Sequence, residues 1–477
     1  MALFDLLDPG NDRPLSDAAE SISRAELSRR AELVASRLRD EGVDGLRLCL
    51  PLDSGLGSLA TLLAVLEHGG RAALMARPAA GADAAWPGFC DALVLPPEPG
   101  APIEDLRIER LPGGGPEDPA VGTERRIWLH SSGTTGKPKW ILHDSRTLIA
   151  NARACVDRLG LHAEDRVMIP VPIHHMFGLG AGLLPSLLAG AAIKLVARGN
   201  PLVVFQAQRS FDPTVMFMVP SQVRSILALG RKAGRARLVV VAGDRVAPDE
   251  AAAFEADHGH LISLYGSSEY GAITASWPSD PANLRHLTAG PPMAGVSLAL
   301  DPDDATPEGE GALPMKIVHE NGFMGYTDPD TGAMIAPAPR LWATGDLVKL
   351  HDGPDGKPRI EIMGRADHAV NRDGLLVHLG HIEGCLSRAS GVALCGVVAA
   401  GKSRRGTGIV AYCALTREGI TTAEEILEHC RKGLPARAVP DQLQIVPELP
   451  MLPSGKVDRR KLSSLAQHLA ESRAAQG

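Results

Sequence analysis

The sequence lacks the features that mark several large protein classes. Its 477 residues contain no apolar run that approaches the ~20 residues of a membrane-spanning helix. The start, Met1–Leu7, lacks the basic and then apolar character of a secretory signal, so we expect a cytoplasmic protein. Lysine and arginine number 49 against 56 aspartates and glutamates, which argues against a broad nucleic-acid-binding face.

Cysteine and aromatic residues are also scarce. The seven cysteines are scattered and form no CxxC pair, which disfavours zinc and redox sites and is typical of buried free thiols. Aromatic residues make up only 4%, whereas there are 51 glycines and 37 prolines. This balance indicates a loop-rich α/β protein.

A chain of this length exceeds what one hydrophobic core usually supports, so we expect at least two domains. Helical spacing over Ile22–Glu41, with Ser23 as N-cap, is followed by a buried strand at Leu46–Leu52 and a helix at Ser58–His68. This alternation predicts the βαβ units of a parallel sheet.

A second α/β region runs from Ile127 to about Trp277, and a β-rich subdomain is expected from Gly290 to Leu350. After Gly364 a helix–strand–strand–helix pattern predicts a small α+β domain. The predicted fold class is therefore α/β, with a large N-terminal domain (1–364) and a small C-terminal domain (365–477). In the second region we expect helices at Ser145–Leu159 and Ser221–Leu229, and strands at Arg126–Leu129, Arg166–Ile169, Ala192–Leu195, Val215–Val219, Leu238–Ala242 and Leu261–Tyr265.

The strongest motif is a run of small and hydroxyl residues with two lysines, directly after a predicted strand. Small residues let the backbone approach an anion closely, and N–H groups, hydroxyls and lysines can converge on phosphate oxygens. It is not a P-loop, because two residues rather than four separate its glycines and a proline follows the first lysine. The run is Ser131, Ser132, Gly133, Thr134, Thr135, Gly136, Lys137, Pro138 and Lys139.

A second motif, Tyr265-Gly266-Ser267-Ser268-Glu269, follows another predicted strand. An aromatic ring can stack on a purine, a hydroxyl can reach a phosphate, and a carboxylate is a hard oxygen ligand for Mg²⁺. A serine-hydrolase elbow is excluded, because Tyr270 stands where its second glycine would be. Alone, the motif is also consistent with a solvated turn.

Three further segments carry residues suited to nucleotide binding. Asp346 can accept two hydrogen bonds from a ribose diol. Arg365 can pair with ribose or phosphate, and Asp367 can absorb a hinge rotation. Lys456 is a point charge on a long stem that can stabilise a phosphoryl or carboxylate oxygen. Each alone is also consistent with a turn, a surface ion pair or a solvated basic terminus.

Together, in this order and spacing, these segments resemble the adenylate-forming superfamily: acyl- and aryl-CoA synthetases, luciferases and peptide-synthetase adenylation domains. The resemblance covers nearly the whole chain and includes the Gly290-Pro291-Pro292 turn and Ile382-Glu383. It implies activation of a small carboxylic acid by ATP and Mg²⁺ as an acyl-adenylate. It also implies transfer to a thiol, by a mobile C-terminal domain that alternates between two placements.

The resemblance also implies a role for each matched residue. The run from Ser131 to Lys139 would hold the ATP phosphates, and Tyr265 to Ser268 would contact adenine and phosphate. Thr134, Glu269 and Lys456 would be catalytic, with Glu269 binding Mg²⁺ and Lys456 bridging the substrate carboxylate and the α-phosphate. Asp346 and Arg365 would bind the ribose, Asp367 would be the hinge, and Gly374 would line the thiol channel.

The acid is predicted from His174-His175-Met176-Phe177-Gly178. Amino-acid adenylation domains have a Phe-Asp pair that binds the substrate ammonium, and here that pair falls on Met176-Phe177. The segment instead resembles the histidine-containing segment of luciferases and CoA ligases, so His175, Phe177 and Gly178 would border the acid. An acid without an α-amino group is favoured, aryl or medium aliphatic. His175 as an ordinary core histidine remains the alternative.

Two departures from the family pattern affect these expectations. Trp140 stands where a glycine is usual after the phosphate-loop lysine, and Asn371 and Asp373 replace residues that are often basic. CoA is the favoured acceptor. A ligase that loads a phosphopantetheine carrier protein, an amide synthetase and a catalytically dead adenylate sensor are the alternatives, and a homodimer is left open.

Overall fold

The computed structural model describes residues 13–68, 70–79, 85–112, 125–131, 139–197, 201–301, 312–373, 375–416, 421–452 and 457–474. The chain divides into two compact units, each assembled from separate segments. The larger unit comprises Met1–Ser297, His319–Arg340 and Asp352–Arg359, and the smaller comprises Leu298–Val318, Leu341–His351 and Ile360–Gly477. A functional boundary between residues 364 and 365 stays a prediction.

The first sheet of the larger unit is built mainly from parallel strands. Its inner strands carry apolar side chains on both faces, as is typical of a sheet that helices cover on both sides. The pairings at its two edges are antiparallel. In spatial order the strands are β14 (Gly271–Ala275), β13 (Gly259–Ser267), β12 (Ala236–Val241), β11 (Val215–Met218), β9 (Arg166–Ile169), β10 (Ala192–Leu195), β1 (Leu15–Ser16) and β2 (Ser21–Ile22).

The second sheet of the larger unit has a parallel centre and antiparallel flanks. All six residues of its strand β3 are buried. In spatial order its strands are β18 (Met334–Pro337), β17 (Gly325–Thr327), β8 (Lys139–Asp144), β7 (Arg126–Ser131), β4 (Arg71–Ala76), β3 (Arg47–Leu52), β5 (Ala92–Leu95) and β6 (Arg107–Arg110). The parallel pairings β5–β3–β4–β7 confirm the predicted βαβ units.

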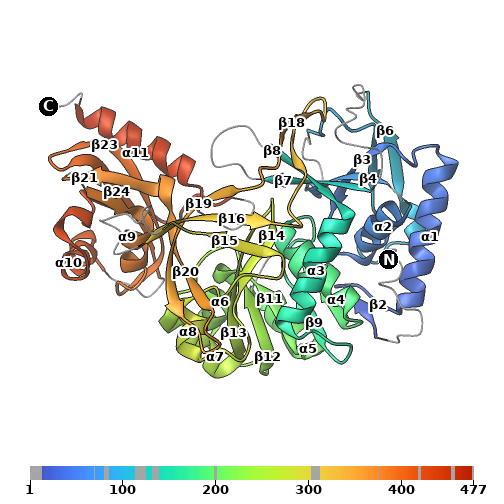
Figure 1. The fold of residues 1–477 in the computed structure, drawn as a ribbon, viewed down its shortest axis with the longest axis horizontal. Helices are drawn as coiled ribbons and strands as arrows, with labels where there is room; N and C mark the ends of the chain where they lie inside the picture. Colours follow the sequence, from blue (N-terminus) through green and yellow to red (C-terminus); the bar gives the residue numbers. More distant parts are fainter. Residues whose placement is uncertain are drawn as a thin grey trace. The chain divides into compact units, whose positions relative to one another are not determined.

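Helix α1 (Arg24–Asp40) begins where the sequence predicts it. The Ser23 side chain accepts a hydrogen bond from the backbone N–H of Glu26 at 3.1 Å. Its buried apolar face repeats at helical spacing through Leu27, Ala31, Val34 and Leu38. Figure 1 shows α1 beside α2 (Leu56–Glu67), next to β3 and β4.

The remaining helices of the larger unit connect successive strands. Helix α3 (Ser145–Leu159) has the predicted bounds, with the Asp144 side chain as N-cap and Gly160 in the left-handed conformation after its end. No helix within the described ranges is long and apolar enough to cross a membrane. The others are a π-helix, η3 (Phe177–Leu183), and α4 (Leu184–Leu188), α5 (Pro201–Phe211), α6 (Pro220–Leu229), α7 (Pro248–His258) and α8 (Ala282–Leu287).

A third sheet accounts for the predicted β-rich subdomain. Its order is β15 (Val296–Ala299), β16 (Leu313–His319), β19 (Trp342–Asp352) and β20 (Pro358–Arg365). Strand β20 starts in the larger unit and passes into the smaller one after Arg359.

The smaller unit is a sheet with helices on both faces. Along β24 (Gly406–Leu415), Ile409, Ala411 and Cys413 pack into one core with α9 (Leu379–Leu386) and α10 (Ala423–Gly433). The alternate residues Val410, Tyr412 and Ala414 pack into another core with α11 (Arg459–Ala474). This is the two-residue period of a strand buried on both faces. The other strands are β21 (Ala369–Arg372), β22 (Leu375–His378), β23 (Val392–Ser403) and β25 (Gln442–Ile445).

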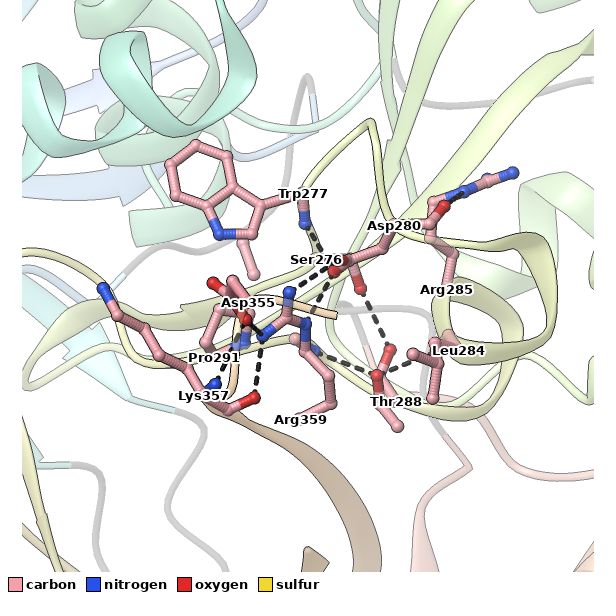
Figure 2. Close-up of polar contacts among 12 residues, drawn as sticks. Ser276, Trp277, Asp280, Leu284, Arg285, Thr288, Pro291, Asp355, Lys357 and Arg359 are labelled. Carbon is pink, nitrogen blue, oxygen red and sulfur yellow. Dashed lines mark hydrogen bonds and ion pairs between the residues drawn. The ribbon is translucent and has the colours of Figure 1, made fainter. Parts of the chain in front are cut away.

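A buried ion pair anchors the start of β20 within the larger unit. Figure 2 shows the Arg359 guanidinium between the carboxylates of Asp280 and Asp355. Arg359 is 1% exposed and Asp280 3%, and Arg359 donates to both Asp280 oxygens, at 2.6 and 2.9 Å. The hydrogen bonds to these carboxylates raise the pKa of Arg359 above its usual value, so the guanidinium stays charged.

We expect Asp280→Asn to lower the free energy of unfolding by up to about 3–5 kcal/mol, because the buried Arg359 charge would lose its buried carboxylate and keep only that of the exposed Asp355. The double variant Asp280→Asn/Arg359→Met removes both charges and should lose less stability than Asp280→Asn alone. Urea unfolding of the two variants and the wild type measures this difference. A double variant that is at least as unstable as the single one would contradict it.

Candidate active site

The motif Tyr265–Glu269 lies at the end of β13 and in the tight turn that leads into β14. Tyr265 pairs with Thr274, and the register shifts before Gly266 pairs with Ala272. A Cβ on Gly266 would lie 2.2 Å from the carbonyl oxygen of Gly271, so the hairpin requires glycine there. The Ser267 hydroxyl accepts a hydrogen bond from the Tyr270 N–H at 3.1 Å, which closes the turn.

Glu269 is held on two sides at the tip of this hairpin. Its carboxylate oxygen Oε1 accepts a hydrogen bond from the Tyr326 hydroxyl at 2.9 Å, and its carbonyl oxygen accepts one from the Phe323 N–H at 2.8 Å. Burial and the negative charge of Glu269 raise the pKa of Tyr326 well above its usual range. The phenol therefore stays protonated and keeps donating to the carboxylate.

The surroundings of Glu269 suit one hard cation shared with a ligand. Its Oε2 has no hydrogen-bond partner among the described residues, while Tyr326 orients the carboxylate through Oε1. The described part of the chain contains no group of three or more His, Cys, Asp or Glu that could hold a metal by itself. Mg²⁺ commonly takes only one or two protein carboxylates together with phosphate oxygens and water, so this set fits it.

His143 supports the same turn from β8. Its ring nitrogen Nε2 lies 2.7 Å from the carbonyl oxygen of Ser268, and because a carbonyl only accepts, Nε2 carries the proton and donates. His143 is 2% exposed, and burial lowers its pKa to about 4. The imidazole is therefore neutral at physiological pH and acts here as a structural donor.

The predicted acid-binding segment leads into the π-helix η3. Single π-turns are uncommon and are frequently found at functional sites. The rings of His174 and His175 lie 4.3 Å apart, and Phe177 packs edge-on against Phe217 at 6.0 Å. A Cβ on Gly178 would lie 2.1 Å from the carbonyl oxygen of Pro172, so only glycine fits.

In the smaller unit, two of the predicted site residues, Asp346 and Arg365, both contact Thr344. In β19, Gly345 has φ +79°, which favours glycine, and the Arg365 guanidinium lies 2.9 Å from where a Cβ would be, so a side chain there would displace it. Arg365 donates to the carbonyl oxygen of Thr344 at 3.2 Å, and the Asp346 N–H donates to the Thr344 hydroxyl at 3.0 Å. Ribose binding by Asp346 and Arg365 stays a prediction.

Several predicted residues lie outside the described part of the chain. Of the phosphate loop, Ser131 and Lys139 form the last backbone pair of β7 and β8, and their side chains are not described. Asp367 lies in a short 3₁₀-helix (Ala366–His368), again without a described side chain. The residues wholly outside it are Ser132, Gly133, Thr134, Thr135, Gly136, Lys137, Gly374 and Lys456.

The structure shows the surroundings of two residues that depart from the family pattern, Trp140 and Asp373. Trp140 is buried at 4% exposure on β8 and packs edge-on against Phe89, with ring centroids 5.6 Å apart. Its bulk is thus accommodated by the core behind the sheet. Asp373 adopts φ +55° in the turn between β21 and β22 and pairs with Arg405 at 3.1 Å.

Sequence reasoning missed His143, Tyr326 and Arg158. Arg158 is buried, donates to the carbonyl oxygens of Ala275, Pro291 and Pro292, and lies 4.2 Å from the ring centroid of Trp277. It therefore holds the Gly290-Pro291-Pro292 turn. The available signal was an arginine on the apolar face of a predicted helix, which must find buried acceptors.

Comparison with known proteins identifies the family. The family model described as AMP-binding enzyme matches residues 97–326, and the AMP-binding enzyme C-terminal domain matches residues 381–456. Triostin synthetase I from Streptomyces triostinicus is 31% identical over 373 residues, which cover 75% of this chain and 67% of that protein. The chain belongs to the AMP-binding enzyme family. The predicted resemblance to adenylate-forming enzymes is confirmed.

A second sequence relative and a solved structure are also similar to this chain over most of its length. A salicylyl-CoA synthase / salicylate adenylyltransferase from a Streptomyces species is 28% identical over 399 residues, covering 78% of this chain and 70% of that protein. The crystal structure of an anthranilate CoA ligase with anthranoyl-AMP superposes with a TM-score of 0.81 at 21% identity, covering 99% of this chain and 98% of the other. The predicted α/β fold class is therefore confirmed.

We expect His143→Gln to flatten the dependence of stability on pH between about 6.5 and 4. In the wild type the unfolded histidine takes up a proton in this range while the buried one does not, so stability falls as pH falls, by at most about 1.4 kcal/mol per pH unit from this residue. Glutamine keeps an N–H donor for Ser268 but does not titrate.

Urea unfolding at a series of pH values measures this effect. His319, whose pKa burial also lowers to about 4, is present in both proteins and contributes equally to both curves. Parallel curves for wild type and variant would show that His143 is not buried in its neutral form.

Proposed function

We propose that this chain activates a carboxylic acid without an α-amino group as an acyl-adenylate, using ATP and Mg²⁺, and then transfers the acyl group to the thiol of CoA. The observation that carries the proposal is the β13–β14 turn, where Tyr326 orients Glu269 and leaves one carboxylate oxygen for a cation. Membership of the AMP-binding family supports the use of ATP.

The first half-reaction joins the substrate carboxylate to the α-phosphorus of ATP. One carboxylate oxygen forms a bond to the α-phosphorus. At the same time the bond between this phosphorus and the oxygen that bridges the α- and β-phosphates breaks, and pyrophosphate leaves. Mg²⁺ bound through Glu269 would neutralise charge on the phosphates. The residues of the turn, braced by His143 and Tyr326, hold Glu269 in place before the substrate arrives, which reduces the reorganisation needed in the transition state.

The second half-reaction moves the acyl group to sulfur. The thiol loses its proton, its sulfur bonds to the acyl carbonyl carbon, and the bond from that carbon to the AMP oxygen breaks. Salicylyl-CoA synthase is named for a product of this kind, and anthranilate CoA ligase for the acid and the CoA that it joins. Their names support CoA as the acceptor for this chain.

The acid follows from the segment before η3. Met176 and Phe177, which the resemblance matches to the Phe-Asp pair of amino-acid adenylation domains, are apolar: Met176 is 7% exposed and Phe177 packs on Phe217. A substrate ammonium next to them would lose its hydration without gaining a counter-charge. An aryl or medium aliphatic acid avoids this cost, and the names of the salicylyl-CoA synthase and the anthranilate CoA ligase refer to aryl acids.

We expect ATP–pyrophosphate exchange to be supported by benzoate-type or medium aliphatic acids and not by α-amino acids, because Met176 and Phe177 offer no charge to an ammonium group. An acid panel in this assay, followed by thioester detection with and without CoA, measures both half-reactions. Exchange supported only by α-amino acids would overturn the assignment of the acid. Exchange without thioester would redirect the acceptor to a carrier protein or an amine.

We expect Glu269→Gln to raise the Mg²⁺ concentration for half-maximal exchange, because a neutral amide is a poorer ligand for a hard cation. Tyr326→Phe should raise it by about tenfold, since a hydrogen bond to a charged group contributes roughly 1.5 kcal/mol or more. Exchange rates across a Mg²⁺ titration measure both effects.

Tyr412→Phe is the matched control for Tyr326→Phe. Tyr412 is 2% exposed and its hydroxyl has no hydrogen-bond partner among the residues that the structure describes, so the same change there removes no hydrogen bond seen in the structure. It should leave the Mg²⁺ requirement unchanged. Equal shifts in the two tyrosine variants, or none for Glu269→Gln, would remove Glu269 from the metal site.

A further inference from the structure

Asn151 occupies an unusual position on the buried face of α3. It is 6% exposed, and its neighbours on this face are Leu148, Ala152 and Cys155. Its amide Nδ2 donates to the carbonyl oxygen of Gly180 at 2.7 Å, and its Oδ1 accepts from the Ala272 N–H at 2.9 Å. One side chain thus holds the backbone of two different segments.

Both segments approach Asn151 at a glycine. Gly271 has φ +64°, and a Cβ there would lie 2.4 Å from Oδ1 of Asn151. A Cβ on Gly180 would lie 3.1 Å from Nδ2 of Asn151 and 2.6 Å from the sulfur of Met176. The close contact therefore depends on the absence of side chains at both places.

The two segments have different tasks in the proposed reaction. Gly180 lies in η3, whose first residues, Phe177 and Gly178, belong to the predicted acid-binding segment and follow His175 in the chain. Ala272 lies at the start of β14, two residues after the turn that presents Glu269, and pairs with Gly266. Helix α3, η3 and β14 also pack against one another.

We propose that Asn151 is a positioning residue that fixes the acid-binding segment relative to the adenylate and metal turn. Because the reacting carboxylate and α-phosphate must be aligned to within a fraction of an ångström, a rigid link between their binding segments favours the reaction. This inference rests on the proposed function. It assigns a role in positioning the acid to Asn151, a residue that lies outside the sequence motifs.

The variant Asn151→Asp keeps one of the two hydrogen bonds and removes the other. An aspartate still accepts from the Ala272 N–H, but its ionised second oxygen would face the carbonyl oxygen of Gly180, and the two acceptors repel. The protonated acid restores a donor to Gly180. Burial raises the pKa of a carboxyl group, so protonation should recur at moderately low pH.

Few other groups near Asn151 titrate in the useful range. The elements packed against α3 are η3, α4, β14 and β8. The first three contain no titratable side chain, and β8 carries Lys139, His143 and Asp144. Burial lowers the pKa of His143 to about 4 and raises that of Cys155, on α3, to about 12. His174 and His175, which precede η3, are present in both proteins, so the ratio of variant to wild type between about pH 5.5 and 8.5 mainly reports the introduced carboxyl.

We expect Asn151→Asp to reduce kcat/KM for the acid in pyrophosphate exchange by about 10- to 100-fold near pH 8, as for a buried acceptor left without its donor. The ratio of variant to wild type should recover as the pH falls towards 5.5. The KM for ATP should change much less, because the bond to Ala272 is kept. Exchange kinetics with each substrate varied at each pH measure this pattern.

A second variant and a matched control keep the test decisive. Gly180→Ala pushes η3 away from Asn151 without adding charge, and should raise the KM for the acid at every pH. Gln208→Glu makes the same amide-to-carboxyl change at a side chain that is 1% exposed and donates to Gly234 at 3.4 Å. It should leave the ratio of the two KM values unchanged.

The outcomes separate this inference from the proposed function. If the wild-type protein supports no exchange with any acid, the proposed function is overturned. The same pH series is then measured by calorimetry on the binding of ATP with Mg²⁺. We expect Asn151→Asp to leave this binding unchanged. Wild-type exchange with a pH-independent loss in Asn151→Asp, or with the same pattern in Gln208→Glu, overturns the role of Asn151.

Discussion

The polar side chains on the buried face of α3 are the constraint on which the rest of the larger unit depends. Asn151 and Arg158 lie in the interior, where each lost hydrogen bond is costly, so they must be satisfied by backbone groups. They reach η3, the start of β14 and the Gly290-Pro291-Pro292 turn. One helix thereby fixes the relative positions of segments that are distant in the sequence.

A buried ion pair constrains another part of the larger unit, the start of β20. The pair of Asp280 and Arg359 fixes the first residues of β20, the strand that later carries Arg365. Such a pair adds little net stability compared with apolar residues of similar size, but it tolerates few alternative arrangements, since either charge alone would be buried unpaired. We infer that its value here is in fixing where the strand begins.

The turn at Glu269 shows how a weak motif becomes a defined site. A tyrosine, a histidine and a glycine, supplied by three different elements, determine the carboxylate's orientation, the support of its turn and the path of the hairpin. The tyrosine, Tyr326, and the histidine, His143, lie outside the motif, whereas the glycine, Gly266, is part of it. The acid-binding segment is defined in the same way, because Gly178 and Gly180 permit contacts that any other residue would block. The chemistry of the motif residues is thus usable only because residues outside it hold them rigidly.

The sequence by itself determined the family, the parallel sheets and the bounds of helices such as α3, because these follow from local motifs and from periods of two and 3.6 residues. It also identified Glu269, Asp346 and Arg365 as candidates. Only the tertiary structure decided that Tyr326 holds Glu269 across 57 residues and that Asn151 meets Ala272 across 121. A local sequence pattern does not indicate which distant backbone group will form a hydrogen bond with a buried polar side chain, because the packing of the sheets and helices determines which groups come into contact.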